Sequence, residues 1–463
     1  MNQHKEQEPK YRYLPIPFEL ESHVNTYDDD SDDDCQIISE RRIDSSSTTS
    51  EPENEEEKEE EEDEEARHEP NYLSLPVLLE IENEYIRVPV LDLTEYIETE
   101  GTTQSPRKLL GRGGYGAVRL GQVKKQIPTL CRDQSLLRSI DHSPECNIFN
   151  RLKGLIALKS IPLPLAETHE TAFIYSVPYH PNLLQVHSLS FNQDFTELNI
   201  VTEKMSLSLA DFIKRKQNSR PRSPLPMKTI KSILLQIASG LAHMNQFGYM
   251  HCDLKPGNIL LTKTSDYYSL EYIRKHNLLD QEYVVKICDY GQATNIELGK
   301  TFGTIGTPSY NAPEITMGHG EYDQFCDIWS LGCIMYTLMS YRELVEPSKG
   351  GVKHLQNLVR ALGSPFFKAE EEDSQRARKY RRSLYRYPHG TNAEFNEFLK
   401  ESLPADTLIN RRGLNVKAKL GELHIDEYNE LCPIADWCLN WDRTKRPSAQ
   451  MLAVYLLPNL KTR

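Results

Sequence analysis

The most constraining feature of the chain is the octapeptide His251–Asn258, which has the sequence HCDLKPGN and leads into the apolar run Ile259–Leu261. Within six residues it places the carboxylate of Asp253, the ammonium of Lys255 and the side-chain amide of Asn258. The proline and glycine between them disfavour a helix, so we expect a loop ahead of a strand. A base, a cation that faces phosphate and an amide that binds metal are the groups that phosphoryl transfer needs. An ordinary polar turn is the competing interpretation, and only the rest of the chain can distinguish the two.

Charge is distributed unevenly along the 463 residues. Residues 1–70 hold 25 Asp and Glu against 7 Lys and Arg, a net charge of −18, whereas the whole chain carries −14. Such a segment repels itself and has little apolar surface to bury, so we expect an acidic disordered tail, which serves either for interaction or only for solubility. Residues 71–463 sum to +4, and this small charge does not favour nucleic acid as a partner.

Other bulk features indicate the compartment. Nine cysteines are scattered without a CxxC pair or the Cys/His spacing of a metal site, which favours reduced thiols in a cytoplasmic or nuclear protein. The N-terminal residues lack the apolar core of a signal peptide, and no run of 18 apolar residues could span a membrane. We therefore expect an intracellular protein without a membrane partner, and the sequence leaves its oligomeric state open.

A glycine-rich motif occupies Leu110–Leu120, with the sequence LGRGGYGAVRL. The GxGxxG spacing alone also fits dinucleotide-binding folds and plain loops. Here Val118 stands two residues beyond the last glycine, Gly116, and strand-like residues follow instead of a helix. A glycine loop between two strands can fold over phosphates through its backbone N–H groups, whereas a dinucleotide loop opens a helix. The motif therefore indicates a hairpin that covers a nucleotide.

Further motifs surround these two. Ile156–Lys159 (IALK) is typical of a strand that ends in a lysine, and Ile230–Met244 has the apolar spacing of a core helix. Asp289–Gly291 (DYG) follows the largely apolar run Val284–Cys288, which indicates a loop after a buried strand. Gly306–Glu314 has the sequence GTPSYNAPE, and the DIWSLG sequence that comes after it is expected to begin a buried helix.

In this order the motifs resemble those of the eukaryotic protein kinase superfamily of the Ser/Thr type, with its HxDxKxxN, VAIK, DFG and APE sequences. The resemblance covers about residues 105–460. It implies an α+β fold of two lobes, a small β-rich N-lobe with helix αC and a larger helical C-lobe, with ATP between them. We expect a kinase domain over 105–461 with an insertion at about 124–152. A lead-in over 71–104, formed by short strands or a packed extension, precedes it.

The resemblance also implies roles for single residues. Asp253 would orient the substrate hydroxyl, and Lys255 would offset charge on the transferred phosphoryl group. Lys159 would hold the α- and β-phosphates with a glutamate of αC, for which Glu170 is preferred to Glu167. The other implied positions are the nucleotide-binding residues Leu110, Gly111, Gly113, Gly114, Gly116, Val118 and Ala157, the hinge residues Glu203 and Met205, whose backbone would bind adenine, and the Mg²⁺ ligands Asn258 and Asp289.

The chain departs from the family pattern in three respects. Cys252 stands where most kinases have an arginine that grips a phosphate on the activation segment, so we predict a segment ordered without phosphorylation, unless another basic residue such as Lys300 substitutes. Tyr290 replaces phenylalanine, which keeps an aromatic plug and adds a hydroxyl. Leu355–Pro365 and Arg378–His389 resemble the insert of the mitogen-activated and cyclin-dependent kinase group, yet the Thr-x-Tyr phosphorylation pair is absent.

Two functions of different classes remain. An active kinase would use ATP and Mg²⁺ to phosphorylate serine and threonine hydroxyls of protein substrates, and nothing in the sequence excludes tyrosine. A pseudokinase would use the same fold as a scaffold that binds partners without catalysis. The residues whose loss usually marks an inactive site are all present, namely Lys159, Asp253, Asn258 and Asp289. The sequence therefore favours an active Ser/Thr kinase and does not identify its substrates.

Overall fold

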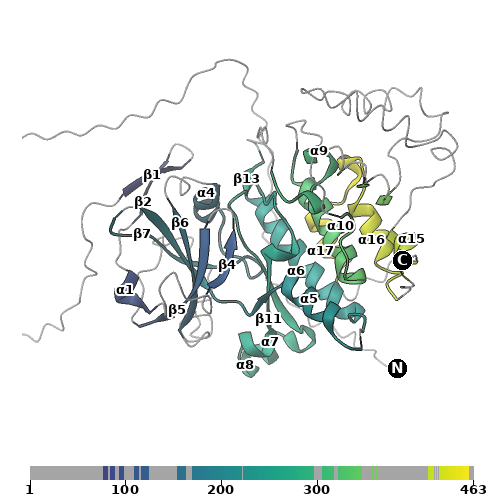
Figure 1. Ribbon diagram of the computed structural model, residues 1–463, viewed down its shortest axis with the longest axis horizontal. Helices are drawn as coiled ribbons and strands as arrows, with labels where there is room; N and C mark the ends of the chain where they lie inside the picture. Colours follow the sequence, from purple (N-terminus) through teal and green to yellow (C-terminus); the bar gives the residue numbers. More distant parts are fainter. Residues whose placement is uncertain are drawn as a thin grey trace, which may run out of the picture. The chain divides into compact units, whose positions relative to one another are not determined.

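Figure 1 shows the computed structural model of the chain, and everything described below belongs to one unit, residues 68–463. The acidic tail predicted over 1–70 and the insertion predicted at about 124–152 lie outside the described residues, apart from Lys124. The structure describes residues 77–81, 84–88, 93–98, 109–113, 116–124, 154–162, 169–194, 196–221, 223–296, 305–316, 322–346, 354, 357–358, 361–362, 416–421, 423, 425 and 427–457.

The lead-in contains short strands. β1 (Val77–Ile81) and β2 (Glu84–Val88) form an antiparallel hairpin with Val77 opposite Val88. α1 (Leu93–Tyr96) follows and leads directly into β3 (Ile97–Glu98), the first strand of the main sheet. The lead-in is therefore continuous with the sheet that the sequence predicted further along the chain.

The main sheet has six strands in the spatial order β3–β5–β6–β8–β7, with β4 paired to β5, and all neighbours are antiparallel. β8 is buried from Leu198 to Glu203, including its polar residues Asn199, Thr202 and Glu203, as fits a strand in the interior of the sheet. α4, the helix expected as αC, lies between β6 and β7 in the chain. The bounds are β4 (Leu109–Gly113), β5 (Gly116–Val123), β6 (Leu155–Pro162), α4 (His169–Ser176), β7 (Val186–Phe191) and β8 (Glu197–Glu203).

One apolar cluster joins the sheet to the lead-in. At Gly121 of β5 a Cβ atom would lie 2.6 Å from Ile97 Cγ2 and 2.7 Å from Ile156 Cδ1, so only glycine allows these strands to pack so closely. The cluster consists of Leu93, Tyr96, Ile97, Val123, Ile156, Leu158 and Val201.

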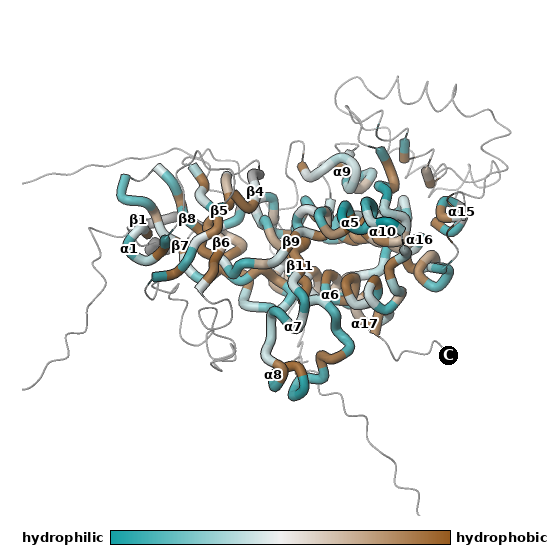
Figure 2. Tube along the Cα trace, turned by 60° about the horizontal axis from the view of Figure 1, so that its bottom comes forward, coloured by the Kyte–Doolittle hydropathy of each residue, from teal (hydrophilic) through white to brown (hydrophobic). Residues whose placement is uncertain are grey.

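A second, larger core is helical. The predicted core helix is α6 (Met227–Gln246), and its apolar stripe is buried against α10, α17 and β12. α10 (Phe325–Ser340) is buried along nearly its whole length, so it forms the centre of this part. Figure 2 shows the hydrophobic residues of α6 and α10 in the interior of the helical part. The other helices there are α5 (Leu209–Asn218), α9 (Pro313–Thr316), α15 (Val416–Gly421), α16 (Cys432–Cys438) and α17 (Ala449–Tyr455).

Short strands hold the loops between the two cores. β11 lies between β12 and β9 in a three-stranded antiparallel sheet, and β10 pairs with β13. An insertion between β11 and β12 contains α7, α8 and the 3-10 turn η4, and lies beside β11 in both Figures 1 and 2. The bounds are β9 (Leu207–Ser208), β10 (Tyr249–Met250), η3 (Pro256–Asn258), β11 (Ile259–Lys263), α7 (Thr264–Tyr267), α8 (Leu270–Lys275), η4 (Leu278–Asp280), β12 (Tyr283–Ile287), β13 (Thr294–Asn295), η5 (Pro308–Tyr310) and η7 (Arg443–Lys445).

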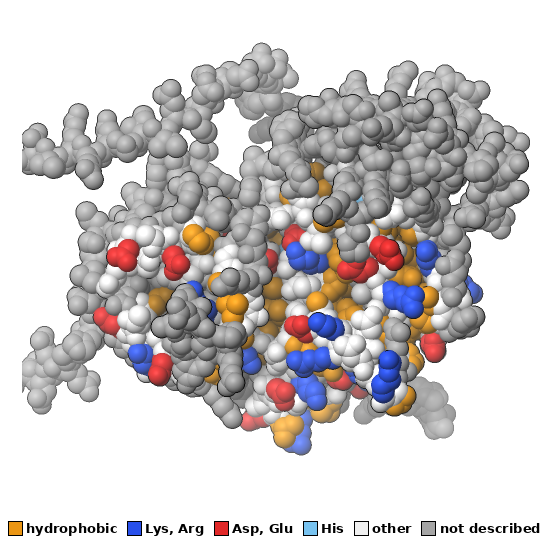
Figure 3. All heavy atoms as spheres, in the orientation of Figure 1, with side chains coloured by type: hydrophobic (Ala, Val, Ile, Leu, Met, Phe, Trp, Pro, Cys, Tyr) orange, Lys and Arg blue, Asp and Glu red, His pale blue; other side chains and the backbone are white. Residues whose placement is uncertain are grey.

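This arrangement confirms the predicted α+β fold, with a small β-rich part that contains α4 and a larger helical part (Figure 1). Acidic and basic side chains lie side by side on the described surface in Figure 3, which agrees with the small net charge of residues 71–463. Within the described residues, none of the helices combines the length and the apolar character needed to cross a membrane.

Candidate active site

The octapeptide His251–Asn258 is a loop between β10 and β11, as predicted, and α10 holds its beginning. The Asp327 carboxylate accepts hydrogen bonds from the backbone N–H groups of His251 (2.7 Å) and Cys252 (2.9 Å). Cys252 has a left-handed backbone with φ 64°, a strained conformation for a residue other than glycine. The two hydrogen bonds from Asp327 hold this conformation and set the direction in which the loop continues.

The Asp253 carboxylate is held on both oxygens. Oδ2 accepts hydrogen bonds from Lys255 Nζ at 2.6 Å and from Asn258 Nδ2 at 3.1 Å, and Oδ1 accepts one from the Thr307 hydroxyl at 2.6 Å. Lys255 Nζ also donates to Thr307 Oγ1 at 2.9 Å. The loop thus brings its three predicted residues together, and Thr307 joins them from the GTPSYNAPE segment. The carboxylate is fixed in one orientation beside a positive charge.

Lys159 lies between two carboxylates. Its Nζ is 2.7 Å from Glu170 Oε2 and 2.9 Å from Asp289 Oδ1. The lysine comes from β6, where it pairs with Val118 of β5, the glutamate from α4, and the aspartate from the loop after β12. Glu170 therefore makes the ion pair, and Glu167, the alternative considered from the sequence, lies outside the described residues.

The neighbouring charges determine the ionisation states of Lys159 and Asp289. Burial alone would lower the pKa of Lys159, but the charges of Glu170 and Asp289 outweigh it and raise that pKa above its ordinary value. Burial alone would raise the pKa of Asp289, and the Lys159 ammonium outweighs this and lowers it. At neutral pH the lysine is positive and Asp289 is negative, which suits binding of phosphate and of a cation.

Tyr290 fills the position predicted for an aromatic plug. Its ring stacks on Phe173 of α4, with centroids 4.1 Å apart. Its hydroxyl donates to Ile287 O at 2.8 Å and accepts from Leu184 N–H at 2.9 Å, and burial raises the pKa of Tyr290 well above its ordinary value. The extra hydroxyl therefore ties the segment after β12 to the chain that leads into β7.

The glycine-rich motif is a β-hairpin of β4 and β5, with Gly113 opposite Gly116. A Cβ at Gly116 would lie 2.2 Å from Ser160 O, and its φ is +154°, so glycine is required there. A strand follows the motif, which rules out the dinucleotide alternative. Leu110 and Gly111 lie on β4, Val118 on β5 and Ala157 on the adjacent β6, and Gly114 is outside the described residues.

The two residues predicted to form the hinge lie at the end of β8 and just beyond it. Glu203 is the last residue of β8, and Met205 comes between β8 and β9. Within the described part of the chain, the Met205 backbone N–H has no hydrogen-bond partner, so it is free to bind a ligand. The Glu203 side chain points into the protein and pairs with Lys286 at 2.8 Å, which sequence reasoning did not foresee.

The segment after the site is anchored to the helical core. Glu314 accepts a hydrogen bond from Arg446 Nη2 at 2.8 Å, although the two residues are 132 positions apart in the chain. Arg446 also lies over the Trp329 ring, 5.0 Å from its centroid. Asn311 Nδ2 donates to Ile305 O at 2.8 Å, which closes the turn before α9. Thr301, Thr304 and Lys300, on which the prediction for Cys252 depends, lie outside the described residues.

The donor set near Asp289 fits a hard divalent cation that also binds phosphate oxygens. Asp289 offers a carboxylate whose side chain is 31% exposed, and the Asn258 amide nitrogen faces Asp253, which leaves its oxygen available. The backbone N–H of Cys288 donates to the backbone carbonyl oxygen of Asn258 at 2.9 Å, and this bond holds Asn258 and Asp289 near each other. In the described ranges no group of three or more His, Cys, Asp or Glu residues is arranged to hold a metal.

Several residues of the site were missed from the sequence. Asp327, Lys286 and Tyr267 act through contacts with residues far along the chain, and no motif spacing pointed to those contacts. For Thr307, its place in the GTP sequence before the APE motif was the available signal. The contact of Thr307 with Asp253 depends on how the GTPSYNAPE segment packs against the loop of residues 251–258.

Comparison with known proteins agrees with this geometry. The family described as "Protein kinase domain" matches residues 105–455. The chain is 25% identical over 389 residues to the meiosis induction protein kinase IME2/SME1 of Saccharomyces cerevisiae, which covers 81% of this chain and 56% of that protein. It is 28% identical over 288 residues to mitogen-activated protein kinase 4 of Oryza sativa (61% of this chain, 66% of the relative). The predicted resemblance to the mitogen-activated kinase group is thereby confirmed.

A third relative carries the acceptor type in its name. Serine/threonine-protein kinase NLK2 of Xenopus laevis is 32% identical over 198 residues, which is 42% of this chain and 38% of that protein. The chain spans about half the length of the curated relatives that it matches.

Proposed function

The chain belongs to the protein kinase domain family, and on this premise we propose that it is a Ser/Thr protein kinase, which transfers the γ-phosphate of ATP to hydroxyls of protein substrates. The observation that supports this most is the position of Lys159, 2.7 Å from Glu170 and 2.9 Å from Asp289. A scaffold that only binds partners does not require a charged lysine held between these two carboxylates. The name of the NLK2 relative supports serine or threonine as the acceptor.

Asp253 is the residue that meets the acceptor. Its carboxylate accepts a hydrogen bond from the substrate hydroxyl and directs the oxygen toward the γ-phosphorus. Lys255, whose Nζ lies 2.6 Å from that carboxylate, offsets charge on the phosphoryl group as it moves. Because Asn258 and Thr307 hold the carboxylate in advance, little reorganisation is needed when charge develops.

The nucleotide is held by groups on both sides of the site. Lys159 binds the α- and β-phosphates, the β4–β5 hairpin covers them, and the backbone of Glu203 and Met205 binds adenine. A divalent cation, which we propose to be Mg²⁺, neutralises the phosphate oxygens when it is bound. Asp289 and the side-chain oxygen of Asn258 would hold it. Positioning and electrostatics then provide most of the rate enhancement.

A phosphotransfer assay with Asp253→Asn tests this function. Purified protein is incubated with γ-labelled ATP and a peptide array, and the labelled amino acid is identified. We expect label on serine and threonine, and a turnover about 10²–10⁴-fold lower for Asp253→Asn with ADP affinity retained. Asp194→Asn, the same change at an exposed turn, serves as the control and should keep wild-type turnover.

Three results would contradict the proposal. Near-native turnover of Asp253→Asn would remove this residue from its role. A wild-type protein that binds ADP but transfers no phosphate would establish the scaffold alternative. Label on tyrosine alone would overturn the acceptor assignment.

We also propose that the activation segment works without phosphate. Cys252 is buried and its side chain has no positive charge, so this position cannot bind a phosphate as an arginine does. Protein made in bacteria and treated with phosphatase should keep its turnover. Loss of turnover after phosphatase, and equally in Thr301→Ala with Thr304→Ala, would show that phosphate is required.

A further inference from the structure

Glu203 carries a carboxylate that the proposed nucleotide site does not use, because only the backbone of the hinge would bind adenine. The side chain is 1% exposed. It accepts a hydrogen bond from the Gln185 backbone N–H at 3.0 Å, pairs with Lys286 Nζ at 2.8 Å, and accepts a hydrogen bond from the Tyr267 hydroxyl. A buried charge persists only when it is paired and hydrogen-bonded. These three partners therefore hold the last residue of β8 in place through its buried side chain.

Lys286 connects this carboxylate to the rest of the site. It lies on β12, three residues before Asp289, and its side chain is 1% exposed. Its Nζ also donates to Leu183 O at 3.3 Å and lies over the rings of Tyr179 (5.9 Å) and Tyr267 (5.5 Å). The pair thus joins the hinge strand, the strand before Asp289 and the chain that enters β7.

Tyr267 belongs to α7, in the insertion between β11 and β12, yet it is fully buried. Its hydroxyl contacts the Glu203 carboxylate, and its ring packs in one apolar cluster with Met205 and Val284. Thr262 Oγ1 lies 3.6 Å from Met205 Sδ and supports the same side chain from β11. A single side chain of the insertion therefore contacts Glu203 and belongs to the same apolar cluster as Met205, the two residues assigned to adenine binding.

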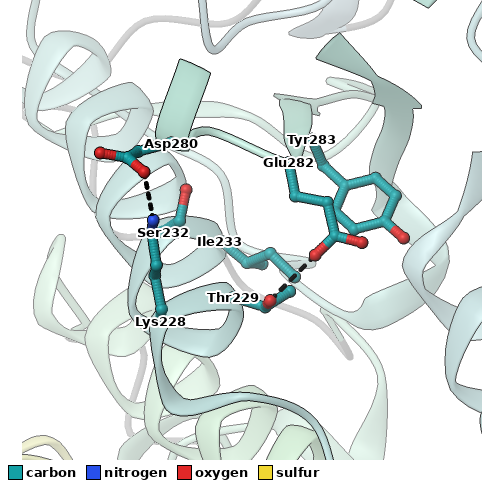
Figure 4. A pocket seen from close by; sticks show the side chains of 7 residues that line it. All are labelled: Lys228, Thr229, Ser232, Ile233, Asp280, Glu282 and Tyr283. Atoms are coloured by element: carbon teal, nitrogen blue, oxygen red, sulfur yellow. Dashed lines mark hydrogen bonds and ion pairs between the residues drawn. The ribbon is translucent and has the colours of Figure 1, made fainter. Parts of the chain in front are cut away.

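The far end of the insertion is attached to α6, as Figure 4 shows. Thr229 Oγ1 donates to Glu282 Oε2 at 2.9 Å, and Lys228 pairs with Asp280. A hollow of about 180 Å³ lies beneath these contacts. Its lining consists of Lys228, Thr229, Ser232, Ile233, Asp280, Glu282 and Tyr283. The insertion is therefore fixed at its start by Tyr267 and at its end by α6, and it can hold the hinge in place.

We infer that Tyr267 is a positioning residue for the nucleotide: through Glu203 and Met205 it holds the hinge backbone in the geometry that binds adenine. The inference rests on the proposed function, since it assumes that the hinge binds ATP. It makes the insertion between β11 and β12 a determinant of nucleotide affinity, although the insertion does not itself contact the nucleotide. Its effect should fall on the adenine end of ATP and leave phosphate binding and the chemical step unchanged.

Binding and kinetics of Tyr267→Phe test this inference on the full chain. The substitution removes the hydroxyl and keeps the ring in the apolar cluster with Met205 and Val284. We expect the dissociation constants of adenosine and ADP, measured by calorimetry, to rise about three- to tenfold, in keeping with the net contribution of one typical intramolecular hydrogen bond. The affinity for inorganic tripolyphosphate, which lacks adenine, should not change. The KM for ATP should rise by the same factor while kcat stays the same.

Two matched controls separate positioning from general stability. Tyr428→Phe removes a buried hydroxyl that donates to Leu225 O at 2.9 Å in the helical part, and Tyr272→Phe makes the same change on the outer part of the insertion. Neither should alter adenosine affinity.

Each other outcome of these measurements overturns the inference. The inference is wrong if Tyr267→Phe leaves adenosine affinity unchanged, lowers tripolyphosphate affinity equally, or lowers only kcat. It is also wrong if a control variant shows the same loss of adenosine affinity. Adenosine and ADP binding do not depend on phosphate transfer, so an inactive protein that still binds them would refute only the proposed function. A wild-type protein that binds neither would refute both.

Discussion

Two lysine–glutamate pairs of nearly equal length join strands of the molecule to other elements: one links β6 to α4, and the other links β12 to β8. Lys159 and Glu170 are 2.7 Å apart, and Lys286 and Glu203 are 2.8 Å apart. The first lysine is 14% exposed and also contacts Asp289, whose side chain is 31% exposed. Both members of the second pair are 1% exposed. The same kind of ion pair is therefore partly exposed to solvent at Lys159 and fully buried at Lys286.

The difference teaches what burial does to an ion pair. An accessible lysine with two carboxylates can exchange one partner for a phosphate at little cost, because all the charges stay compensated. A fully buried pair cannot replace one partner by a ligand in this way. Removing one member leaves the other as a charge with neither solvent nor a partner. We therefore expect substitutions in the first pair to affect catalysis and substitutions in the second to affect stability.

The largest expected effect is that of Lys159→Met on turnover. The change removes the charge that holds the α- and β-phosphates, so kcat/KM should fall about 10²–10³-fold, as when one preorganised charge is removed from a site. Phosphotransfer at several ATP concentrations measures this, and thermal unfolding should show a smaller loss than for Lys286→Met. If Lys159→Met retains turnover, or destabilises the fold as much as Lys286→Met does, the two pairs do not differ in the way proposed.

Lys286→Met should mainly destabilise the fold. It leaves the Glu203 carboxylate buried without its cation, which lowers the free energy of unfolding by about 3–5 kcal/mol in comparable buried pairs. Urea denaturation followed by fluorescence measures this. Adding Glu203→Leu removes the orphaned charge but leaves the Gln185 N–H and the Tyr267 hydroxyl without their acceptor, so it should restore only part of the stability. A loss below about 1 kcal/mol, the range of exposed pairs, would show that the second pair is not sealed.

Tyr290→Phe extends the comparison of the two ion pairs to an uncharged side chain that follows Asp289 in the chain. It restores the residue usual in the family and keeps the ring on Phe173, but removes hydrogen bonds with Ile287 O and Leu184 N–H. We expect a loss of about 1–2 kcal/mol in the free energy of unfolding with turnover nearly unchanged. Tyr428→Phe, which loses one hydrogen bond, should cost less. Abolished turnover would mean that the hydroxyl acts in catalysis.

The smallest effect concerns pH. Lys159 lowers the pKa of Asp289, so their attraction stabilises the fold above the unfolded pKa of Asp, near 3.9, and is lost as pH falls through the lower folded value. The pKa of Lys159 is raised, so its contribution is complete below about pH 10.4 and is lost only at higher pH. The difference in free energy of unfolding between wild type and Lys159→Met should therefore shrink as the pH falls below about pH 4. A difference that grows as the pH falls through this range would contradict the assigned pKa direction of Asp289.

The sequence by itself determined the local parts of this protein. Glycine spacing, the proline and glycine of HCDLKPGN and the apolar stripe of Ile230–Met244 act through contacts within a few residues, so hairpin, loop and core helix were predictable from them. The choice of Glu170 also came from local order, because a helix between β6 and β7 can present few acids to Lys159.

Only the tertiary structure decided which distant groups meet. Asp327 holds His251 and Cys252, Thr307 joins Asp253, and Tyr267 reaches Glu203 across 64 residues. None of these contacts follows from spacing, because each depends on how α10, the segment before α9 and the β11–β12 insertion pack onto the central strands. A carboxylate such as that of Glu203 appears in the sequence as an ordinary hinge acid. Its burial beside Lys286, which excludes water and makes every partner necessary, exists only in the folded chain.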